Sequence, residues 1–247
     1  MVMVELKRNL EFAIESAKLA GNFLSENYSK ELDVVMDEGR DIKLKVDQEA
    51  EKIITNFLSR HSNIPIMGEE FGASQKLEGD FWLIDPLDGT SNFFRNIPIC
   101  AVSVALIQNN VPVIGVINDF LNHKLYFARK GGGAYCNEEI IKTSTVTEKN
   151  KGTLVTGIPA RESYTEDDFR EIISQFQDWK KVRMIGSATI ANILVATGSA
   201  DMYHEDGIFF WDIAAGSVIV KEAGGVARIT NFQDDYRVDA EFTNGNF

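Results

Sequence analysis

Apolar residues in the first part of the chain recur at the spacing of one helix face. They are Leu6, Leu10, Ala13, Ala17, Ala20 and Leu24. This 3.6-residue period predicts an amphipathic helix over residues 3–28. The period changes to two over residues 42–46, which predicts a strand, and it returns to helical spacing over residues 46–58. Asp47 lies at that junction between strand and helix.

Short apolar runs predict the strands that follow. One run covers residues 64–67 and leads into Gly68, and another covers residues 81–84 and ends at Asp85. Four further apolar runs have the pattern of an antiparallel meander, with strands at 100–107, 111–117, 124–128 and 134–136. The expected turns between them include Asn109-Asn110 and Asn122-His123.

From about residue 150 the pattern alternates between strand and helix. Strands are expected at 153–157, 182–185, 200–204 and 226–229. Helices are expected at 166–179, 188–197 and 212–223. An α+β part followed by an α/β part predicts a mixed fold of two closely packed units, residues 1–147 and 148–247.

Composition narrows the class of protein. The chain has 247 residues, of which 44% are hydrophobic, so a sizeable core can form and the disordered class is excluded. The formal net charge is −12 at pH 7, which disfavours direct binding to nucleic acid. An acidic protein that acts on an anionic substrate needs local positive charge, and bound cations would supply it.

Cysteine use and the N-terminus bear on location. Cys100 and Cys136 are far apart and form no zinc motif, so we expect reduced thiols and a cytoplasmic protein. Residues 1–12 carry several charged side chains, and no apolar signal-peptide core follows them. No run approaches the roughly 20 apolar residues that span a bilayer, so we expect no membrane association.

Residues 85–90 are the strongest candidate for chemistry. Asp85 ends an apolar strand, and Asp88 follows three residues later. We expect Pro86 to end the strand, so that both carboxylates converge beyond it. With the Leu87 carbonyl between them, these carboxylates offer the oxygen ligands that Mg²⁺ prefers.

Gly89 and Thr90 complete this segment. Glycine lets the backbone approach a ligand closely, and a helix beginning at Thr90 would present free N–H groups to an anion. The competing interpretation is an ordinary turn, because Asp-Gly is a strong turn signal.

Other acidic residues occupy similar places. Glu69 follows Gly68 at a strand end, and Asp212 opens an apolar helix. Taken singly, a solvated loop explains Glu69, and helix N-caps explain Asp47 and Asp212. Their common position at strand ends and helix starts, where α/β sheets gather ligands, favours a shared site.

Other catalytic templates fit poorly. The chain has no G-x-S-x-G segment for a serine nucleophile and no G-x-x-x-x-G-K-[ST] phosphate loop. Its three histidines, His61, His123 and His204, lack metal-ligand spacing. Gly131-Gly132-Gly133 lies between expected strands and indicates a hairpin or bulge.

These segments, in order, resemble the signature of the inositol monophosphatase family. That signature has a G-E-E segment, then D-P-[IL]-D-G-T after an apolar strand, then W-D. The matching segments are Val46-Asp47-Gln48, Gly68-Glu69-Glu70, residues 82–93, Gly186-Ser187-Ala188, Glu205 and Trp211-Asp212. The resemblance covers nearly the whole chain.

The resemblance implies an alternating αβαβα layered fold of the inositol monophosphatase and fructose-1,6-bisphosphatase type. It also implies a homodimer, lithium sensitivity and two or three Mg²⁺ ions. Glu69, Asp85 and the Leu87 carbonyl would hold one ion, and Asp85, Asp88 and Asp212 a second. Glu69, together with waters, would help to hold a third.

The resemblance also implies catalytic and substrate-binding residues. Asp47, Thr90 and Glu69 are the implied catalytic residues, with Asp47 and Thr90 orienting the attacking water. The implied substrate contacts are Leu87, Asp88, Gly89, Thr90, Gly186, Ser187, Ala188, Glu205 and Asp212, among which the N–H groups of Gly89 and Thr90 would bind the phosphate. Such a site suits phosphoryl transfer, which needs positioning and charge neutralisation more than covalent help.

The expected function is Mg²⁺-dependent hydrolysis of a small phosphorylated polyol or sugar, inositol 1-phosphate in first place. The same chemistry on fructose 1,6-bisphosphate, histidinol phosphate or a 3′-phosphoadenosine nucleotide is the alternative, and a partner-binding regulatory role is a further one. A haloacid dehalogenase-type mechanism is disfavoured, because that family needs a nucleophilic aspartate where this chain has Pro86.

Overall fold

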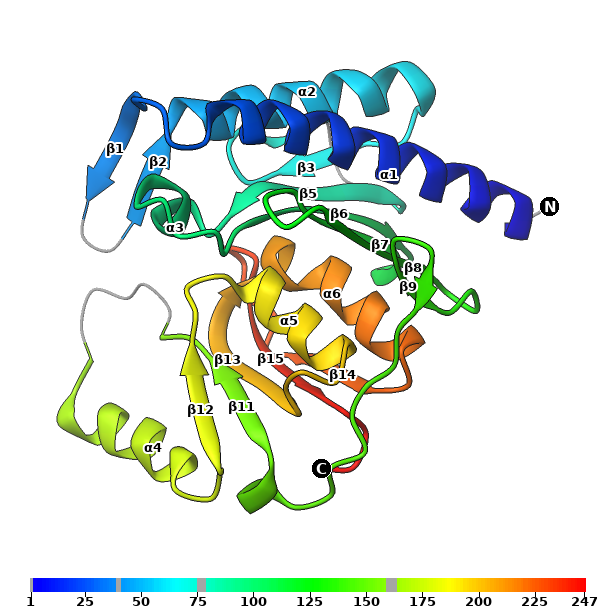
Figure 1. The fold of residues 1–247 in the computed structure, drawn as a ribbon. Coiled ribbons are helices and arrows are strands. Elements are labelled where there is room, and N and C mark those ends of the chain that lie inside the picture. Colours follow the sequence, from blue (N-terminus) through cyan, green and yellow to red (C-terminus); the bar gives the residue numbers. More distant parts are fainter. Residues whose placement is uncertain (1, 39–40, 75–78, 159–163) are drawn as a thin grey trace.

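Helices and sheets alternate in layers in this computed structural model, which describes residues 2–38, 41–74, 79–158 and 164–247. Figure 1 shows α1 and α2 over one face of a large sheet, and α5 and α6 between that sheet and a smaller one. Helix α4 lies on the outer side of the smaller sheet. The αβαβα arrangement expected from the resemblance is confirmed.

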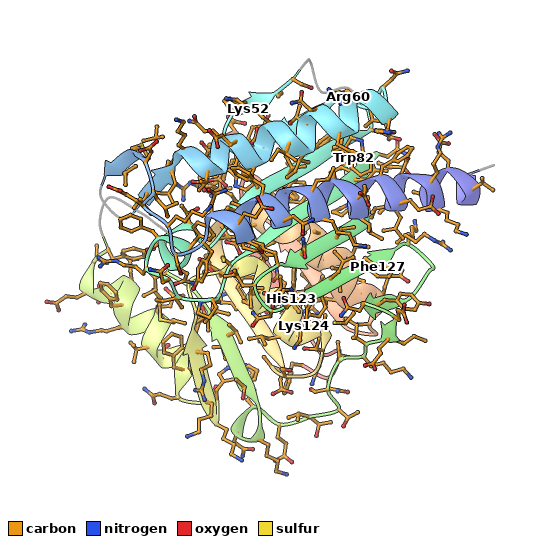
Figure 2. All side chains as sticks on the ribbon, turned by 45° about the horizontal axis from the view of Figure 1, so that its top comes forward. Lys52, Arg60, Trp82, His123, Lys124 and Phe127 are labelled. Carbon is orange, nitrogen blue, oxygen red and sulfur yellow. The ribbon has the colours of Figure 1, made fainter. Side chains whose placement is uncertain are left out.

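The N-terminal helices form as their apolar period predicts. Helix α1 covers Val2–Asn27 and α2 covers Lys45–His61. Their apolar faces are buried in one cluster with Trp82, which is labelled in Figure 2. Helix α2 begins before Val46, which was expected in the strand.

A hairpin of β1 (Val34–Glu38) and β2 (Asp41–Leu44) joins these two helices. The sequence did not predict β1. Within the described ranges these two strands pair with each other alone, and Val34 and Val35 are exposed, so no buried face imposes a strict alternation of apolar and polar residues on this part of β1.

The large sheet has the strand order β10-β9-β8-β7-β6-β5-β3-β4. Strand β3 pairs with β5 in parallel, and the other pairs are antiparallel, as the meander predicted. Helix α3 covers Thr90–Phe94 and connects β5 to β6. The strands are β3 (Ile66–Gly68), β4 (Gly72–Ala73), β5 (Phe81–Asp88), β6 (Ala101–Gln108), β7 (Val111–Asp119), β8 (Lys124–Arg129), β9 (Ala134–Cys136) and β10 (Glu139–Ile140).

The expectation that Pro86 ends its strand is wrong, because β5 continues to Asp88. Asp85 pairs with Ser103 and Asp88 with Ala101, and the register shifts between them. Two residues of β5 therefore face one residue of β6, which is a bulge. A proline has no N–H to donate, and a bulge interrupts the hydrogen-bond ladder at the point where that donor would be needed.

The smaller sheet has the strand order β12-β11-β13-β15-β14. Strand β11 runs parallel to β12 and β13, whereas β15 is antiparallel to β13 and β14. The sequence predicted neither β15 nor the extension of β13 to Phe209. The strands are β11 (Thr153–Thr156), β12 (Lys181–Met184), β13 (Met202–Phe209), β14 (Val226–Thr230) and β15 (Arg237–Thr243).

The remaining helices are α4 (Glu166–Phe176), α5 (Ala188–Ala196) and α6 (Phe210–Glu222). Helix α6 packs against β6, β7 and β8 of the large sheet and against β14 of the smaller one. The approach is close: a Cβ at Gly115 would lie 2.1 Å from the Ala215 oxygen. The expected boundary at residue 147/148 stays a prediction. It lies between the last strand of the large sheet and the first strand of the smaller one.

Two further expectations concern single features. Cys100 and Cys136 are both free, in agreement with reduced thiols. Among the helices of the described ranges, none combines the length and the apolar character needed to cross a bilayer.

Candidate active site

A cavity of about 520 Å³ opens where the end of β5 meets α3, β13 and the starts of α5 and α6. It brings together nearly all the residues that the sequence singled out. Its lining includes Glu69, Asp85, Leu87, Asp88, Gly89, Thr90, Gly186, Ser187, Ala188, Glu205 and Asp212. Asp47 is the predicted site residue that does not line the cavity.

Asp85, Asp88 and Asp212 form a tight acidic cluster. Each offers a carboxylate oxygen, and these oxygens lie within 4.8 Å of one another. Two of the residues come from the end of β5. Asp212 is the third residue of α6, whose N-cap is Phe209, so it is not the cap residue. A negative charge is still favoured there by the helix dipole.

The environment of the cluster disfavours its negative charges. Burial raises the pKa of Asp85, and the charges of Glu69, Asp88 and Asp212 raise it further. Burial is also the main cause that raises the pKa values of Asp88 and Asp212. Buried like charges at this separation need protons or a cation. An oxygen-only ligand set suits Mg²⁺, so these residues fit that ion.

Helix α5 orients Asp88. The Ser187 hydroxyl and the Thr189 N–H both donate to Asp88 Oδ2, the latter at 2.7 Å. Ser187 is also the N-cap of α5 and accepts the Ile190 N–H at 3.2 Å. Ser187, implied as a substrate contact, therefore holds a proposed metal ligand and begins a helix.

The backbone after Asp88 turns sharply at Gly89. Gly89 has a φ of 85°, and a Cβ there would lie 2.7 Å from the Ile99 oxygen, so both conformation and space require glycine. The Thr90 hydroxyl donates to the Leu87 carbonyl at 2.9 Å. The Leu87 N–H donates to Asp85 Oδ1 at 2.9 Å. The segment is thus a hydrogen-bonded loop facing the cavity, and the helix expected to begin at Thr90 does so.

Glu69 and Asp47 come from elements other than those that carry the cluster: Glu69 lies in the turn between β3 and β4, and Asp47 lies on α2. The charge of Glu69 raises the pKa values of Asp85 and Asp212. Asp47 is 3% exposed, and its Oδ2 accepts the Leu44 N–H at 2.8 Å. Leu44 is the N-cap of α2 and Asp47 is the third residue of the helix, so Asp47 is not the cap residue. Its Oδ1 is buried and has no hydrogen-bond partner within the described part of the chain. Burial, followed by the charges of Glu70 and Glu69, raises the pKa of Asp47 to about 8.

Glu205, on β13, also lines the cavity. It is 7% exposed and accepts the Tyr203 hydroxyl at 3.0 Å. Burial raises its pKa to about 7. A Cβ at Gly157 would lie 2.2 Å from Glu205 Oε2, so the neighbouring strand end has room only for glycine.

Sequence reasoning missed several residues that shape the cavity. The Asn92 amide donates to the carbonyls of Ile99 and Ile185, both at 2.8 Å, and ties α3 to the loop before α5. Arg237 on β15 lines the cavity and lies 4.5 Å from the centre of the Phe209 ring. Asn92 lies within the matched segment 82–93, so the sequence offered a signal that could have identified it. Arg237 lies on β15, a strand that the sequence analysis did not predict.

The arrangement agrees with comparisons to known proteins. A sequence profile of the inositol monophosphatase family matches residues 5–242. Inositol monophosphatase 1 from Homo sapiens is 34% identical over 228 residues, which cover 88% of this chain and 82% of the relative. Nus factor SuhB from Xylella fastidiosa is 38% identical over 226 residues, which cover 89% of this chain and 81% of the relative.

A solved structure of the inositol monophosphatase from Anabaena (Nostoc) sp. superimposes with a TM-score of 0.85 at 31% identity. The superposition covers 98% of this chain and 92% of that structure. The chain is therefore a member of the inositol monophosphatase family and, with it, a phosphatase that hydrolyses phosphoric monoesters.

Proposed function

We propose that this phosphatase depends on Mg²⁺ and hydrolyses a small phosphorylated polyol or sugar, inositol 1-phosphate in first place. One observation carries the proposal. The carboxylate oxygens of Asp85, Asp88 and Asp212 lie within 4.8 Å of one another, in a cavity that the turn at Gly89 and Thr90 also lines. Cation ligands and phosphate-binding N–H groups are thereby adjacent.

The acidic residues would hold the metal. Asp85, Asp88 and Asp212 are the proposed ligands of one ion, and Glu69, Asp85 and the Leu87 carbonyl those of another. The bound ions would neutralise phosphate charge and lower the pKa of a water molecule. Raised carboxyl pKa values favour this arrangement, because a cation relieves the repulsion that burial makes expensive.

Asp47 is proposed to help orient the attacking water. Its Oδ1 is a buried oxygen without a partner in the described ranges, so a donor from the attacking water has a place there. Burial raises the pKa of Asp47 to about 8, and a bound cation nearby would favour its charged form. The Thr90 hydroxyl is the second group proposed to orient this water.

The alcohol part of the substrate would face Glu205 and the backbone from Gly186 to Ala188, which line the same cavity as Glu69. Fructose 1,6-bisphosphate, histidinol phosphate and a 3′-phosphoadenosine nucleotide are the alternative substrates for the same chemistry. Lithium sensitivity, a homodimer and a cytoplasmic location stay predictions. A regulatory partner role is the second candidate, favoured by the name of the Xylella relative, Nus factor SuhB.

A substrate panel tests the proposal. Phosphate release should be fastest with inositol 1-phosphate and should require Mg²⁺. Asp85→Asn should lose at least about 100-fold in kcat, since one proposed ligand of both ions is neutralised. Asp178→Asn, at an exposed aspartate, is the matched control and should keep wild-type activity.

Full activity of Asp85→Asn, or no Mg²⁺ binding by calorimetry, contradicts the proposed metal chemistry. Inactivity on inositol 1-phosphate with activity on another ester of the panel keeps the chemistry and changes the substrate. A protein that binds Mg²⁺ but hydrolyses no ester of the panel would favour the regulatory role.

A further inference from the structure

The turn that carries Glu69 is held by a carboxylate from another element. Residues 68–71 connect β3 to β4, and Glu51 on α2 lies against them. Glu51 Oε2 accepts the Glu70 N–H at 2.8 Å, and its Oε1 accepts the Phe71 N–H at 3.1 Å. Glu51 is 2% exposed. One buried carboxylate thus satisfies two consecutive N–H groups of this turn, and both are charge-assisted hydrogen bonds.

The same carboxylate explains the glycine that precedes Glu69. A Cβ at Gly68 would lie 2.1 Å from Glu51 Oε1 and 2.3 Å from its carboxyl carbon. The Glu51 carboxylate therefore occupies the space that any larger residue at position 68 would need. A side chain there would push Glu51 away from the two N–H groups that it accepts.

Other contacts hold the turn in the same place. Lys43 on β2 lies 2.9 Å from Glu70 Oε1. The Lys52 amine lies 5.3 Å from the centre of the Phe71 ring. Figure 2 labels Lys52 on α2, the helix that also carries Glu51. Of residues 68–71, Glu69 is the one that lines the cavity, so its neighbours on both sides serve as anchors.

Helix α2 also carries Asp47, four residues before Glu51. Residues at this spacing share one helix face, and both carboxylates are buried. The helix thus places Asp47 directly and the Glu69 turn through Glu51. The relative position of these two groups depends on one rigid element.

We propose that Glu51 is a positioning residue for Glu69, and that α2 sets the placement of this proposed metal ligand relative to Asp47. This inference rests on the function proposed above. Groups that orient a metal ligand typically change metal affinity by about 10- to 100-fold when they are removed. Glu51 acts on the backbone around the ligand, so its effect should appear in metal affinity.

Two substitutions at Glu51 should weaken Mg²⁺ binding to different degrees. Glu51→Gln keeps the shape and one acceptor oxygen, whereas Glu51→Leu removes both acceptors. We expect Mg²⁺ binding to weaken about 10-fold in Glu51→Gln and about 100-fold in Glu51→Leu. Gly68→Ala, which displaces the carboxylate without removing it, should also weaken binding. Calorimetric titration with Mg²⁺ and the Mg²⁺-dependent shift in Tm measure these effects.

A control separates positioning from stability. Ile54→Ala alters the same helix at a residue with no exposed surface, in the hydrophobic cluster that α1 and α2 form with Trp82, and it removes no acceptor of the Glu69 turn. It should lower the Tm and leave the Mg²⁺ affinity of the folded protein unchanged. If Ile54→Ala and Glu51→Gln weaken Mg²⁺ binding equally, Glu51 has only a structural role and the inference is overturned.

A double-mutant cycle tests whether Glu51 acts through Glu69. Glu51→Gln combined with Glu69→Gln should bind Mg²⁺ no more weakly than Glu69→Gln alone, because the ligand that Glu51 positions is already lost. Additive losses, or wild-type affinity in Glu51→Gln, overturn the inference while leaving the proposed function intact. No Mg²⁺ binding by the wild-type protein overturns the proposed function itself.

Discussion

The acidic side chains of the cavity lie in surroundings that disfavour their charged forms. Burial is the first cause in each case, and mutual repulsion adds to it at Asp85 and Asp212. Such a cluster lowers the stability of the metal-free protein. The same arrangement should bind a cation strongly. A site that destabilises the folded protein in order to function is a common trade-off.

Asp85→Asn tests this opposition. Without divalent ions the variant should be more stable than the wild type by roughly 1–2 kcal/mol, because a buried like charge is removed. Its Asn oxygen can still accept the Leu87 N–H. Addition of Mg²⁺ should raise the Tm of the wild type and leave that of the variant nearly unchanged. A variant that Mg²⁺ stabilises as strongly as the wild type would contradict Asp85 as a ligand.

Glu205 makes a separate prediction about pH. Its pKa in the folded protein is about 7, above the ordinary 4.5 of an exposed glutamate, because it is buried. The folded state therefore holds this proton more tightly than the unfolded state. The resulting stability is fully present below about pH 4.5 and is lost as the pH rises through about 7.

Glu205→Gln should remove this contribution. Between pH 5 and pH 8, the fall in the free energy of unfolding should be smaller in the variant by roughly 2–3 kcal/mol. Urea titrations at both pH values, without divalent ions, measure the difference. Glu26→Gln, at an exposed position on α1, is the control and should keep the wild-type pH dependence. An unchanged dependence in Glu205→Gln would show that burial does not raise this pKa.

The ends of elements, more than their middles, build the cavity. The β5 bulge presents Asp85 and Asp88, the start of α5 holds Asp88, and the first turn of α6 supplies Asp212. Thr189 and Asp88 are 101 residues apart in the chain. The end of β5 and the starts of α5 and α6 are therefore each positioned by the packing of the element to which they belong.

Asn92 on α3 links the segment before β6 to the loop before α5 by its hydrogen bonds, so its removal should lower the stability of the protein. Asn92→Ala removes the donor shared by the carbonyls of Ile99 and Ile185. We expect a loss of about 1–3 kcal/mol in the free energy of unfolding, the usual cost of leaving part-buried polar groups unpaired. Asn122→Ala, at an exposed turn, should cost less than half as much in the same urea titrations. Equal losses would mean that the link between α3 and α5 adds little.

On the scale of the whole molecule, α6 packs against both sheets. It carries Trp211 at the cavity and packs against β6, β7 and β8 as well as β14. One core cluster accordingly contains residues of both parts, such as Ala105 and Ile219. Two units that share a central helix cannot lose one sheet without exposing the core of the other.

We therefore expect a single cooperative unfolding transition. Far-UV circular dichroism and tryptophan fluorescence, which reports on Trp82 in the first part and on Trp179 and Trp211 in the second, should give the same urea midpoint. A separate fragment of residues 1–147 should fail to fold, because the face of its sheet that α6 covers would be exposed. Two resolved transitions, or a stable fragment, would contradict this coupling.

Much of the fold was predictable wherever an element has a regular apolar face. Helices α1 and α2 and the meander formed as their periods indicated. Strands β1 and β15 were missed, and Pro86 was wrongly expected to end β5. Pairing decides two of these features: within the described residues β1 pairs with β2 alone, and the bulge exists because β6 runs beside β5. Strand β15 does alternate, with Val238, Ala240 and Phe242 buried, so the signal that was missed there was present in the sequence.

The sequence by itself determined the candidate residues and their family, because each motif is a short local segment and the order of the motifs can be read directly from the sequence. Only the tertiary structure decided that Asp212 lies beside Asp85, that Asp47 is buried, and that Glu51 holds the Glu69 turn. Distance and burial depend on which elements meet. Those two quantities set the charge repulsion, the pKa values and the attraction for a cation, and no local stretch of sequence records them.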